Sequence, residues 1–132
     1  MKNTMLASLM ALLGIMSTNA AADWVRVYSN DKLVAFADSS SIRKKGNILK
    51  VLSLFDFKAE NVLTDGESYN SIIRETEFNC KDNQQRMISF SIHSGKMGKG
   101  KMLESGSDPQ DWKPVSKEAV AVEMRDYACG NS

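Results

Sequence analysis

The 132-residue chain is 42% hydrophobic and 25% charged, with 8 glycines and 2 prolines. This length fits one globular domain, and the composition excludes collagen-like and disordered chains. Lys and Arg total 17 against 16 for Asp and Glu, a formal net charge of +1. A chain so close to neutral has no uniform field to attract a polyanion, so we expect no nucleic-acid partner.

The N-terminus has the pattern of a secretory signal. Lys2 precedes a 12-residue apolar run at residues 5–16, which is too short to span a bilayer because a spanning helix needs about 20 apolar residues. A polar stretch and an alanine triplet then place small residues at the −3 and −1 positions of a cut before Asp23.

We therefore predict a cleaved signal peptide at residues 1–22 and a single domain at residues 23–132, with no transmembrane anchor. Lys2 is the only charged residue that cleavage removes, so the formal net charge of the remaining 110 residues is 0.

Strand-like alternation of apolar and polar residues occupies most of the mature chain. We predict strands at residues 23–29, 32–38, 48–57, 69–80, 86–94 and 101–105, with polar connections at 39–47 and 58–68. Residues 48–57 are apolar on both faces, which is typical of a central strand. The clearest alternation puts one set of residues inward and another outward: Ile88, Phe90 and Ile92 inward, Ser89, Ser91 and His93 outward.

The C-terminus changes to a helical period. We predict a helix at residues 117–130, with Ser116 as its N-cap and Glu118 in its first turn. One face carries an apolar stripe at i, i+4, i+7, formed by Val120, Met124 and Tyr127. The fold class that follows is α+β: an antiparallel meander of five or six strands packed by one C-terminal helix.

Cys80 and Cys129 are the only cysteines and lie 49 residues apart. In an exported chain such a pair is most simply one disulfide, which here ties the end of the fourth strand to the end of the helix. A zinc site would have only His93 to add to the two cysteines, whereas a closed zinc site has four ligands, and no Cys-x-x-Cys motif is present. We predict a disulfide and neither a metal nor a cofactor.

A series of short fragments runs through most of the mature chain: Trp24-Val25, Asp38-Ser39-Ser40-Ser41-Ile42, Gly46-Asn47, Leu54-Phe55-Asp56-Phe57, Tyr69-Asn70-Ser71, Glu77-Phe78-Asn79-Cys80, Gly100, Trp112-Lys113-Pro114-Val115 and Cys129. In their order, spacing and cysteine placement, these fragments resemble the bacterial surface-adhesin protein E family.

The resemblance implies a six-stranded antiparallel sheet with a C-terminal helix tethered by a disulfide, and a binding protein of the cell envelope. It also implies host matrix or serum proteins such as vitronectin, laminin and plasminogen as partners, and a homodimer. The family's type member is a lipoprotein, whereas this chain has no cysteine at the processing site. We therefore expect an exported protein, periplasmic or secreted, that is soluble after signal cleavage. The alternative is a periplasmic accessory or inhibitor protein that binds another envelope component.

Residues for catalysis are few. His93 is the only histidine and is predicted on a polar strand face beside Ser89 and Ser91, where a solvated surface histidine is the simplest interpretation. Glu75 and Glu77 share a strand face about 7 Å apart, as glycosidase carboxylates do, but two outward glutamates on a half-exposed strand are ordinary solubilising residues. We predict that the protein is not an enzyme.

Two basic tips and one tryptophan are candidate ligand contacts. Lys96, Lys99 and Lys101 alternate with glycines in a predicted mobile hairpin tip, and residues 43–45 form a second basic turn. Two solvated turns are the simpler interpretation, since the mature chain has no net charge. Trp112 is a candidate interface anchor or a residue that packs onto the following helix.

Overall fold

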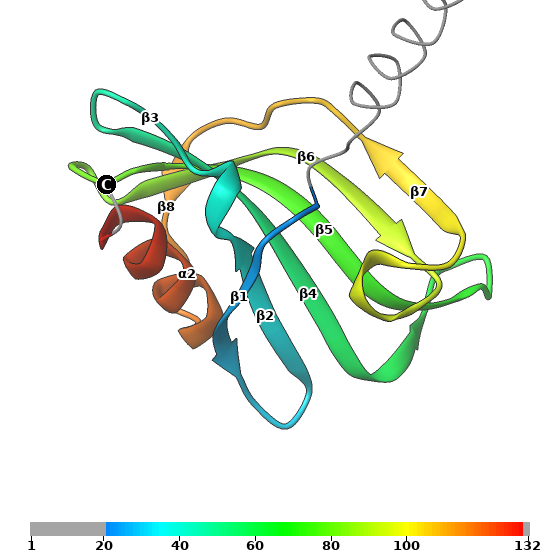
Figure 1. The fold of residues 1–132 in the computed structure, drawn as a ribbon. Coiled ribbons are helices and arrows are strands. Elements are labelled where there is room, and N and C mark those ends of the chain that lie inside the picture. Colours follow the sequence, from blue (N-terminus) through cyan, green and yellow to red (C-terminus); the bar gives the residue numbers. More distant parts are fainter. Residues whose placement is uncertain (1–20, 131–132) are drawn as a thin grey trace, which may run out of the picture.

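The computed structural model describes residues 21–130, so the predicted signal peptide lies outside the described part except for its last two residues. The elements follow one another in a simple order (Figure 1). They are β1 (Trp24–Ser29), β2 (Leu33–Asp38), the 3₁₀ turn η1 (Ser39–Ser41), β3 (Arg43–Lys45), β4 (Ile48–Val62), β5 (Ser68–Asn79), β6 (Gln84–His93), the 3₁₀ turn η2 (Lys96–Gly98), β7 (Met102–Gly106), β8 (Lys113–Pro114) and α2 (Ala119–Gly130).

The six longer strands form one antiparallel meander in the order β1-β2-β4-β5-β6-β7. Two short strands extend it, since β3 pairs with β4 and β8 pairs with β6. The central position predicted for the strand with two apolar faces is confirmed, because β4 lies between β2 and β5. The predicted α+β meander is therefore the observed fold.

Two connections contain more strand than the sequence predicts. β4 continues through residues 58–62, which we expected to be a loop, and it rejoins the ladder with β5 after an irregularity between Asp56 and Asn61. The polar connection at residues 39–47 contains β3, whose pairing begins where Lys45 faces Ile48 across the turn. Both additions are polar, so they lack the apolar alternation that reveals a strand in sequence. Backbone hydrogen bonds to the neighbouring strand hold them in the sheet.

α2 packs on one face of the sheet and closes the core. Met124 and Ala128 of the helix are buried against Ala35 of β2, Val51 of β4 and Phe78 of β5. Val120 and Tyr127 also pack against this cluster, which confirms the predicted apolar stripe. The helix covers the end of the sheet at which β5 finishes (Figure 1).

The helix begins two residues later than predicted. The Glu118 carbonyl accepts hydrogen bonds from the amides of Ala121 and Val122, so Glu118 precedes the first turn. Ser116 still caps locally, because its Oγ accepts the Glu118 amide at 3.2 Å. The later start of the helix does not change which of its faces is buried.

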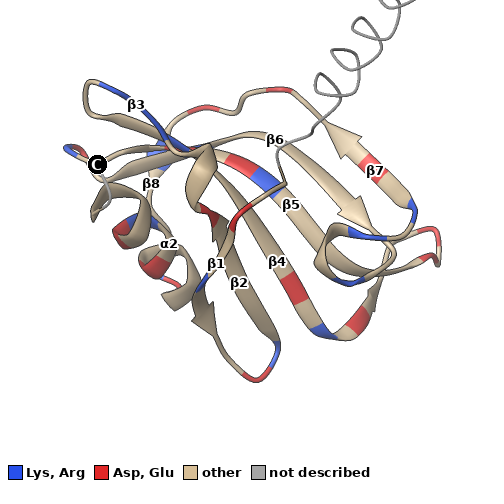
Figure 2. Ribbon diagram, in the orientation of Figure 1, with Lys and Arg blue, Asp and Glu red and all other residues tan. Residues whose placement is uncertain are grey.

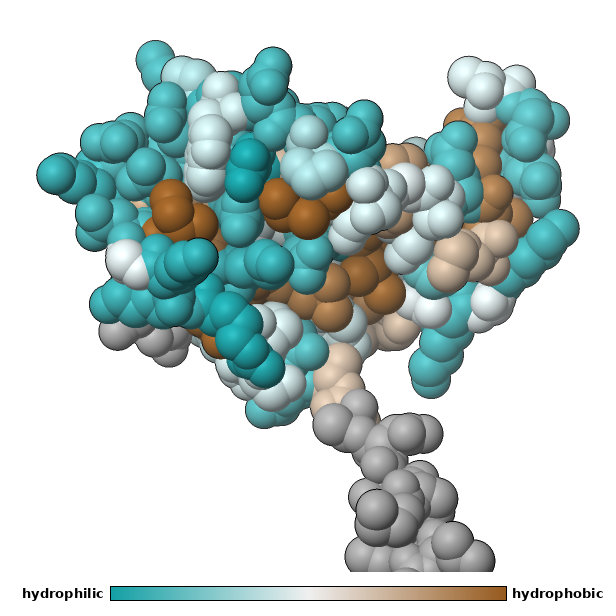
Figure 3. All heavy atoms as spheres, turned by 90° about the horizontal axis from the view of Figure 1, so that it is seen from above, coloured by the Kyte–Doolittle hydropathy of each residue, from teal (hydrophilic) through white to brown (hydrophobic). Residues whose placement is uncertain are grey.

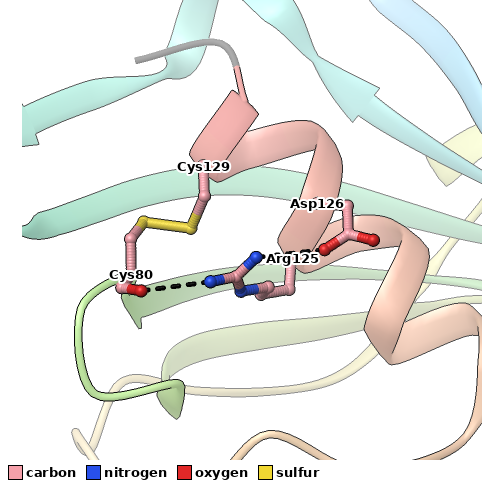
Figure 4. Close-up of polar contacts among 4 residues, drawn as sticks. All are labelled: Cys80, Arg125, Asp126 and Cys129. Carbon is pink, nitrogen blue, oxygen red and sulfur yellow. Dashed lines mark hydrogen bonds and ion pairs between the residues drawn. A yellow bond between two sulfur atoms is a disulfide. The ribbon is translucent and has the colours of Figure 1, made fainter.

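The disulfide between Cys80 and Cys129 is present and joins the residue after β5 to the last turn of α2 (Figure 4). A second contact lies beside it: Arg125 Nη2 donates to the Cys80 carbonyl oxygen at 3.0 Å, and Arg125 Nη1 lies 3.1 Å from Asp126 Oδ1. The covalent link and the arginine contact hold the same corner of the sheet against the helix.

The opposite sheet face is covered at its far end by the segment that contains η2. Ser71 is fully buried on β5, where its Oγ donates to the Gly95 carbonyl at 2.6 Å and accepts the Gly98 amide at 2.9 Å. The amide of Met97 donates to Asp56 Oδ1 at 2.8 Å. This segment is thus fixed to β4 and β5 by hydrogen bonds from its backbone.

Gly98 brings the segment into direct contact with the sheet. Its φ is +73°, and a Cβ at this position would lie 2.8 Å from Ile73 Cδ1. Only glycine has both the conformational freedom and the small size for this approach. The η2 segment therefore covers this end of the sheet face, and the uncovered part of the face lies toward β3.

Candidate functional site

Charged side chains from four strands line up on the sheet face opposite α2. Arg43 of β3 is paired with Lys50 of β4, Lys50 with Glu77 of β5, and Glu77 with Arg86 of β6. Glu77 is adjacent in sequence to Phe78, which is buried under the helix, so its side chain points to the other face. Directly opposite residues in antiparallel pairs have side chains on the same face, so the four form one row across the sheet.

Trp112 closes this row at the β6 side. It immediately precedes β8, whose Lys113 pairs with Gln85 of β6. The Arg86 guanidinium lies 4.8 Å from the centroid of the Trp112 ring, in cation–π geometry. Arg86 Nε also donates to Glu77 Oε1 at 2.8 Å, which fixes the arginine between a carboxylate and an aromatic ring.

A second row lies beside the first, nearer the strand ends, and the two rows form a shallow groove. Its volume is about 440 Å³ on the Trp112 side and about 320 Å³ on the β3 side. The second row comprises Lys45, Ile48, Asn79 and Gln84. We refer to the charged and aromatic residues of the two rows as the basic groove: Arg43, Lys45, Lys50, Glu77, Arg86 and Trp112.

The basic groove carries four cationic side chains and one carboxylate. The β3 strand is entirely basic (Figure 2), and the carboxylate of Glu77 is already paired with Arg86. Seen from above, hydrophilic residues cover most of the surface, and hydrophobic residues show in small patches and in a band across the middle (Figure 3). The four cationic side chains suit the groove to contact with anionic groups.

The structure separates the predicted contact residues into two places. Trp112 lies in the basic groove, whereas Lys96, Lys99 and Lys101 lie at the other end of the sheet, in and next to η2. The Lys96 ammonium donates to the carbonyl of Phe57, and Lys99 and Lys101 are exposed. The segment is not the free hairpin tip expected from its glycines, because its backbone is bonded to the sheet.

Three groove residues were not marked as site residues in the sequence: Lys50, Glu77 and Arg86. Lys50 and Arg86 occupy ordinary polar positions of their strands, so their type and spacing carry no sign of a site. Glu77 stood out only through its spacing from Glu75. The signal that identifies them is the register across β3, β4, β5 and β6, which places them in a row with Arg43. This register depends on long-range pairing and is not readable from a local pattern.

His93 is buried, which corrects the expectation of a solvated surface histidine. Only 8% of the residue is exposed, and its Nε2 lies 2.8 Å from Ser91 Oγ. Burial lowers the pKa of the imidazole, since desolvation disfavours the charged ring. The Ser91–His93 contact therefore satisfies two polar side chains within the sheet.

Neither a metal centre nor a membrane span is found in the part of the chain that the structure describes. Between residues 21 and 130, no group of three His, Cys, Asp or Glu side chains is arranged to hold a metal ion. Over the same residues, no helix combines the length and apolar character needed to cross a bilayer.

Comparison with known proteins gives a consistent result. The family model described as surface-adhesin protein E matches residues 24–130. Among solved structures, crystal form II of Haemophilus influenzae protein E superposes with a TM-score of 0.66 at 12% identity, over 86% of this chain and 92% of that one. Protein E from non-typeable Haemophilus influenzae gives a TM-score of 0.61 at 13% identity, over 86% and 79% of the two chains. A search of curated proteins finds no match.

At 12–13% identity the structural likeness establishes the fold. The family match extends over β1 to α2, the whole sheet and the helix that packs on it. The chain therefore belongs to the surface-adhesin protein E family.

Proposed function

We propose that this chain is an exported, noncatalytic binding protein whose basic groove docks on an acidic surface of a macromolecular partner outside the cytoplasm. The observation that carries the proposal is the row of Arg43, Lys50, Glu77 and Arg86 across four strands, with Trp112 at its end. Membership of a family described as a surface adhesin supports a role in binding. Host matrix and serum proteins, namely vitronectin, laminin and plasminogen, are the partners we propose.

The physical basis is electrostatic attraction with an aromatic anchor. Complementary charge speeds the encounter of two proteins and orients them, and Arg and Trp are the side chains that most often dominate interface energetics. Arg86 and Trp112 are already held against each other, so docking does not have to order them. A prearranged pair loses less conformational entropy on binding than two free side chains do.

A noncatalytic role is supported by the contacts that Glu77 and His93 make. Glu77 is paired with Arg86 at 2.8 Å, so it is not a free acid–base group, and only 16% of its side chain is exposed. The imidazole of His93 is buried against Ser91. Both interactions satisfy the hydrogen-bonding groups of these residues within the sheet, which is a structural role.

The location and assembly that we propose follow the sequence. The disulfide Cys80–Cys129 supports an oxidising compartment, the periplasm or the extracellular side, as expected for a chain with a cleaved signal.

We also propose a homodimer. Light scattering on the purified, oxidised protein tests it, and a monomeric mass at micromolar concentration would refute it.

The central experiment measures binding of the purified protein to immobilised vitronectin, laminin and plasminogen at physiological salt. We expect the Lys45→Glu, Lys50→Glu variant to bind at least one of them with about tenfold lower affinity or worse, the equivalent of about 1.4 kcal/mol. A variant with the same charge change at the other end of the sheet, Lys99→Glu, Lys101→Glu, serves as the matched control and should bind like the unmodified protein. Duplex DNA tests for nonspecific attraction.

Each outcome has a definite meaning. Loss of binding in the Lys99, Lys101 variant alone would place the contact at η2 instead of the basic groove. Retention of none of the three host proteins would refute the host-adhesin role. Capture of an envelope component from a cell-envelope extract, lost in the Lys45, Lys50 variant, would then identify the periplasmic accessory or inhibitor function.

A further inference from the structure

The buried end of β2 forms a small network around one carboxylate. Asp38 is 6% exposed. Its Oδ1 accepts the Ser40 amide at 3.0 Å, the Ser40 hydroxyl at 2.6 Å and the backbone nitrogen of Asp23 at 3.0 Å. The nitrogen of Asp23 is thus in direct contact with a carboxylate that has little access to water.

Asp23 is held in this place from its other side as well. The Ser39 amide donates to the Asp23 carbonyl at 3.0 Å, and the Ser39 hydroxyl donates to Asp23 Oδ2 at 2.9 Å. The next residue, Trp24, is paired with Asp38 in the β1–β2 ladder. Three backbone or side-chain contacts therefore fix the position of the Asp23 nitrogen.

We propose that this nitrogen becomes the α-amino group of the mature chain and forms an ion pair with Asp38. Hydrolysis of the Ala22–Asp23 peptide bond by a signal peptidase consumes one water molecule. It leaves a carboxylate on Ala22 of the leader and, after protonation, an α-ammonium on Asp23. The sequence places this bond directly after the alanine triplet, and Ala22 is exposed.

The ion pair strengthens a contact that already exists. In the uncleaved chain the Asp23 nitrogen is a neutral amide with one proton, whereas the α-ammonium carries a positive charge and three. Hydrogen bonds between two charged groups are roughly twice as strong as neutral ones. The hydrogen bonds that Asp38 receives outweigh its burial and lower the pKa of its carboxyl, so it is ionised and ready to pair.

The consequence is a stabilisation that depends on maturation. β1 is an edge strand of the sheet, paired only with β2 within the ladder. Before cleavage Asp23, the residue that precedes β1, is held by neutral hydrogen bonds, and after cleavage it is held by an ion pair with a buried partner. Removal of the leader thus tightens the N-terminal edge of the sheet once the chain has been exported.

The first measurement is the intact mass of the protein after export with its own leader. We expect the mass of a chain that begins at Asp23. A chain that begins at any other residue would overturn the proposal.

The second measurement is a double-mutant cycle on purified, oxidised protein. Scarless fusion cleavage gives one chain that starts at Asp23 and one that starts at Ala21, each with and without Asp38→Asn. We expect the chain that starts at Asp23 to melt about 4–8 °C higher than the longer chain. The difference should disappear with Asp38→Asn, since the amide cannot form the ion pair. An equal difference in both backgrounds, or none in either, would refute it.

If the Asp38→Asn chains do not fold, titration of the unmodified mature protein decides the question. Besides Asp38, the charged groups close to the amine are the Asp23 side chain and Arg43, whose charge acts on Asp38. We expect NMR to show the α-amino pKa raised above its ordinary range of about 7.7–8.0. A value within that range would refute the ion pair.

Discussion

His93 shows how one residue gains a pH response from its place in the sheet. The ring is buried and its Nε2 contacts Ser91 Oγ, and burial lowers the pKa of the imidazole. The folded protein therefore resists a proton that the unfolded chain accepts near the ordinary histidine pKa of about 6.5. Stability linked to this group is complete above that pH and is lost as the pH falls below it.

We expect the free energy of unfolding to fall between pH 7.5 and pH 5.5, and the His93→Gln variant to lose this dependence. Urea denaturation at both values measures the effect. Asp38 does not interfere, since its pKa is lowered from 3.8 and it titrates below this window. An equal loss of stability in the variant would show that another group is responsible.

At the scale of elements, one buried hydroxyl bonds the η2 segment at two points. Ser71 bonds both Gly95 and Gly98, and its removal leaves a carbonyl and an amide without that partner. An unsatisfied buried polar group costs about 1–3 kcal/mol. The segment's attachment to β5 is therefore local and testable.

The Ser71→Ala variant should lose about 1–3 kcal/mol of unfolding free energy. Its amides at residues 95–100 should exchange faster with deuterium, because two of the hydrogen bonds that hold the segment to the sheet are lost. Ser68→Ala, at an exposed position of the same strand, is the matched control and should change stability by about 0.5 kcal/mol or less. Similar losses in both variants would contradict the role of Ser71.

α2 relies on the disulfide in the same way that η2 relies on Ser71. Cys80 and Cys129 close a loop across 49 residues, and the chain-entropy model gives such a link about 4 kcal/mol of stabilisation. A 12-residue helix has little stability of its own, so it depends on its attachment.

The Cys80→Ser, Cys129→Ser variant should lose several kcal/mol, up to about 4 kcal/mol. Thermal unfolding monitored by circular dichroism, with and without reductant, provides the measurement. Reductant should lower the melting temperature of the unmodified protein toward that of the variant and leave the variant unchanged. A melting curve of the unmodified protein that reductant does not shift would contradict the stabilising role.

At the scale of the whole molecule, the two faces of the sheet are covered in different ways. One face is closed by α2 over Val51 and Phe78. The other is closed by η2 at one end and open at the basic groove. The formal charge of the chain is only +1, so the cations of the groove act as a local field and not as part of an overall positive charge.

If a partner docks on the basic groove as proposed, the local field of the groove makes the association rate depend on salt. We expect the association rate constant to fall as NaCl is raised from 50 to 300 mM, while the dissociation rate constant changes little. The Arg43→Gln, Lys50→Gln variant should show a weaker salt dependence in surface plasmon resonance. A salt response that persists unchanged in this variant would place the field elsewhere.

The features of this protein that follow from the local periodicity of apolar residues could be predicted from the sequence alone. The alternation of β2 and β5, the two apolar faces of β4 and the stripe of Val120 and Met124 report which side of an element is buried, whereas in β6 both Ile92 and its neighbour His93 are buried. Such patterns reflect the strand period of 2 and the helix period of 3.6. The cysteine pair added the one covalent link, and the order of fragments indicated the family.

Features that depend on pairing between distant segments could be seen in the folded structure alone. The strand continuation at residues 58–62 is polar and is held by its partner β5, and the burial of His93 is set by the sheet and not by its polar neighbours. The basic groove exists because the register of four strands brings Arg43 into line with Arg86. Register is set by hydrogen bonds and packing across strands, which no single stretch of sequence contains.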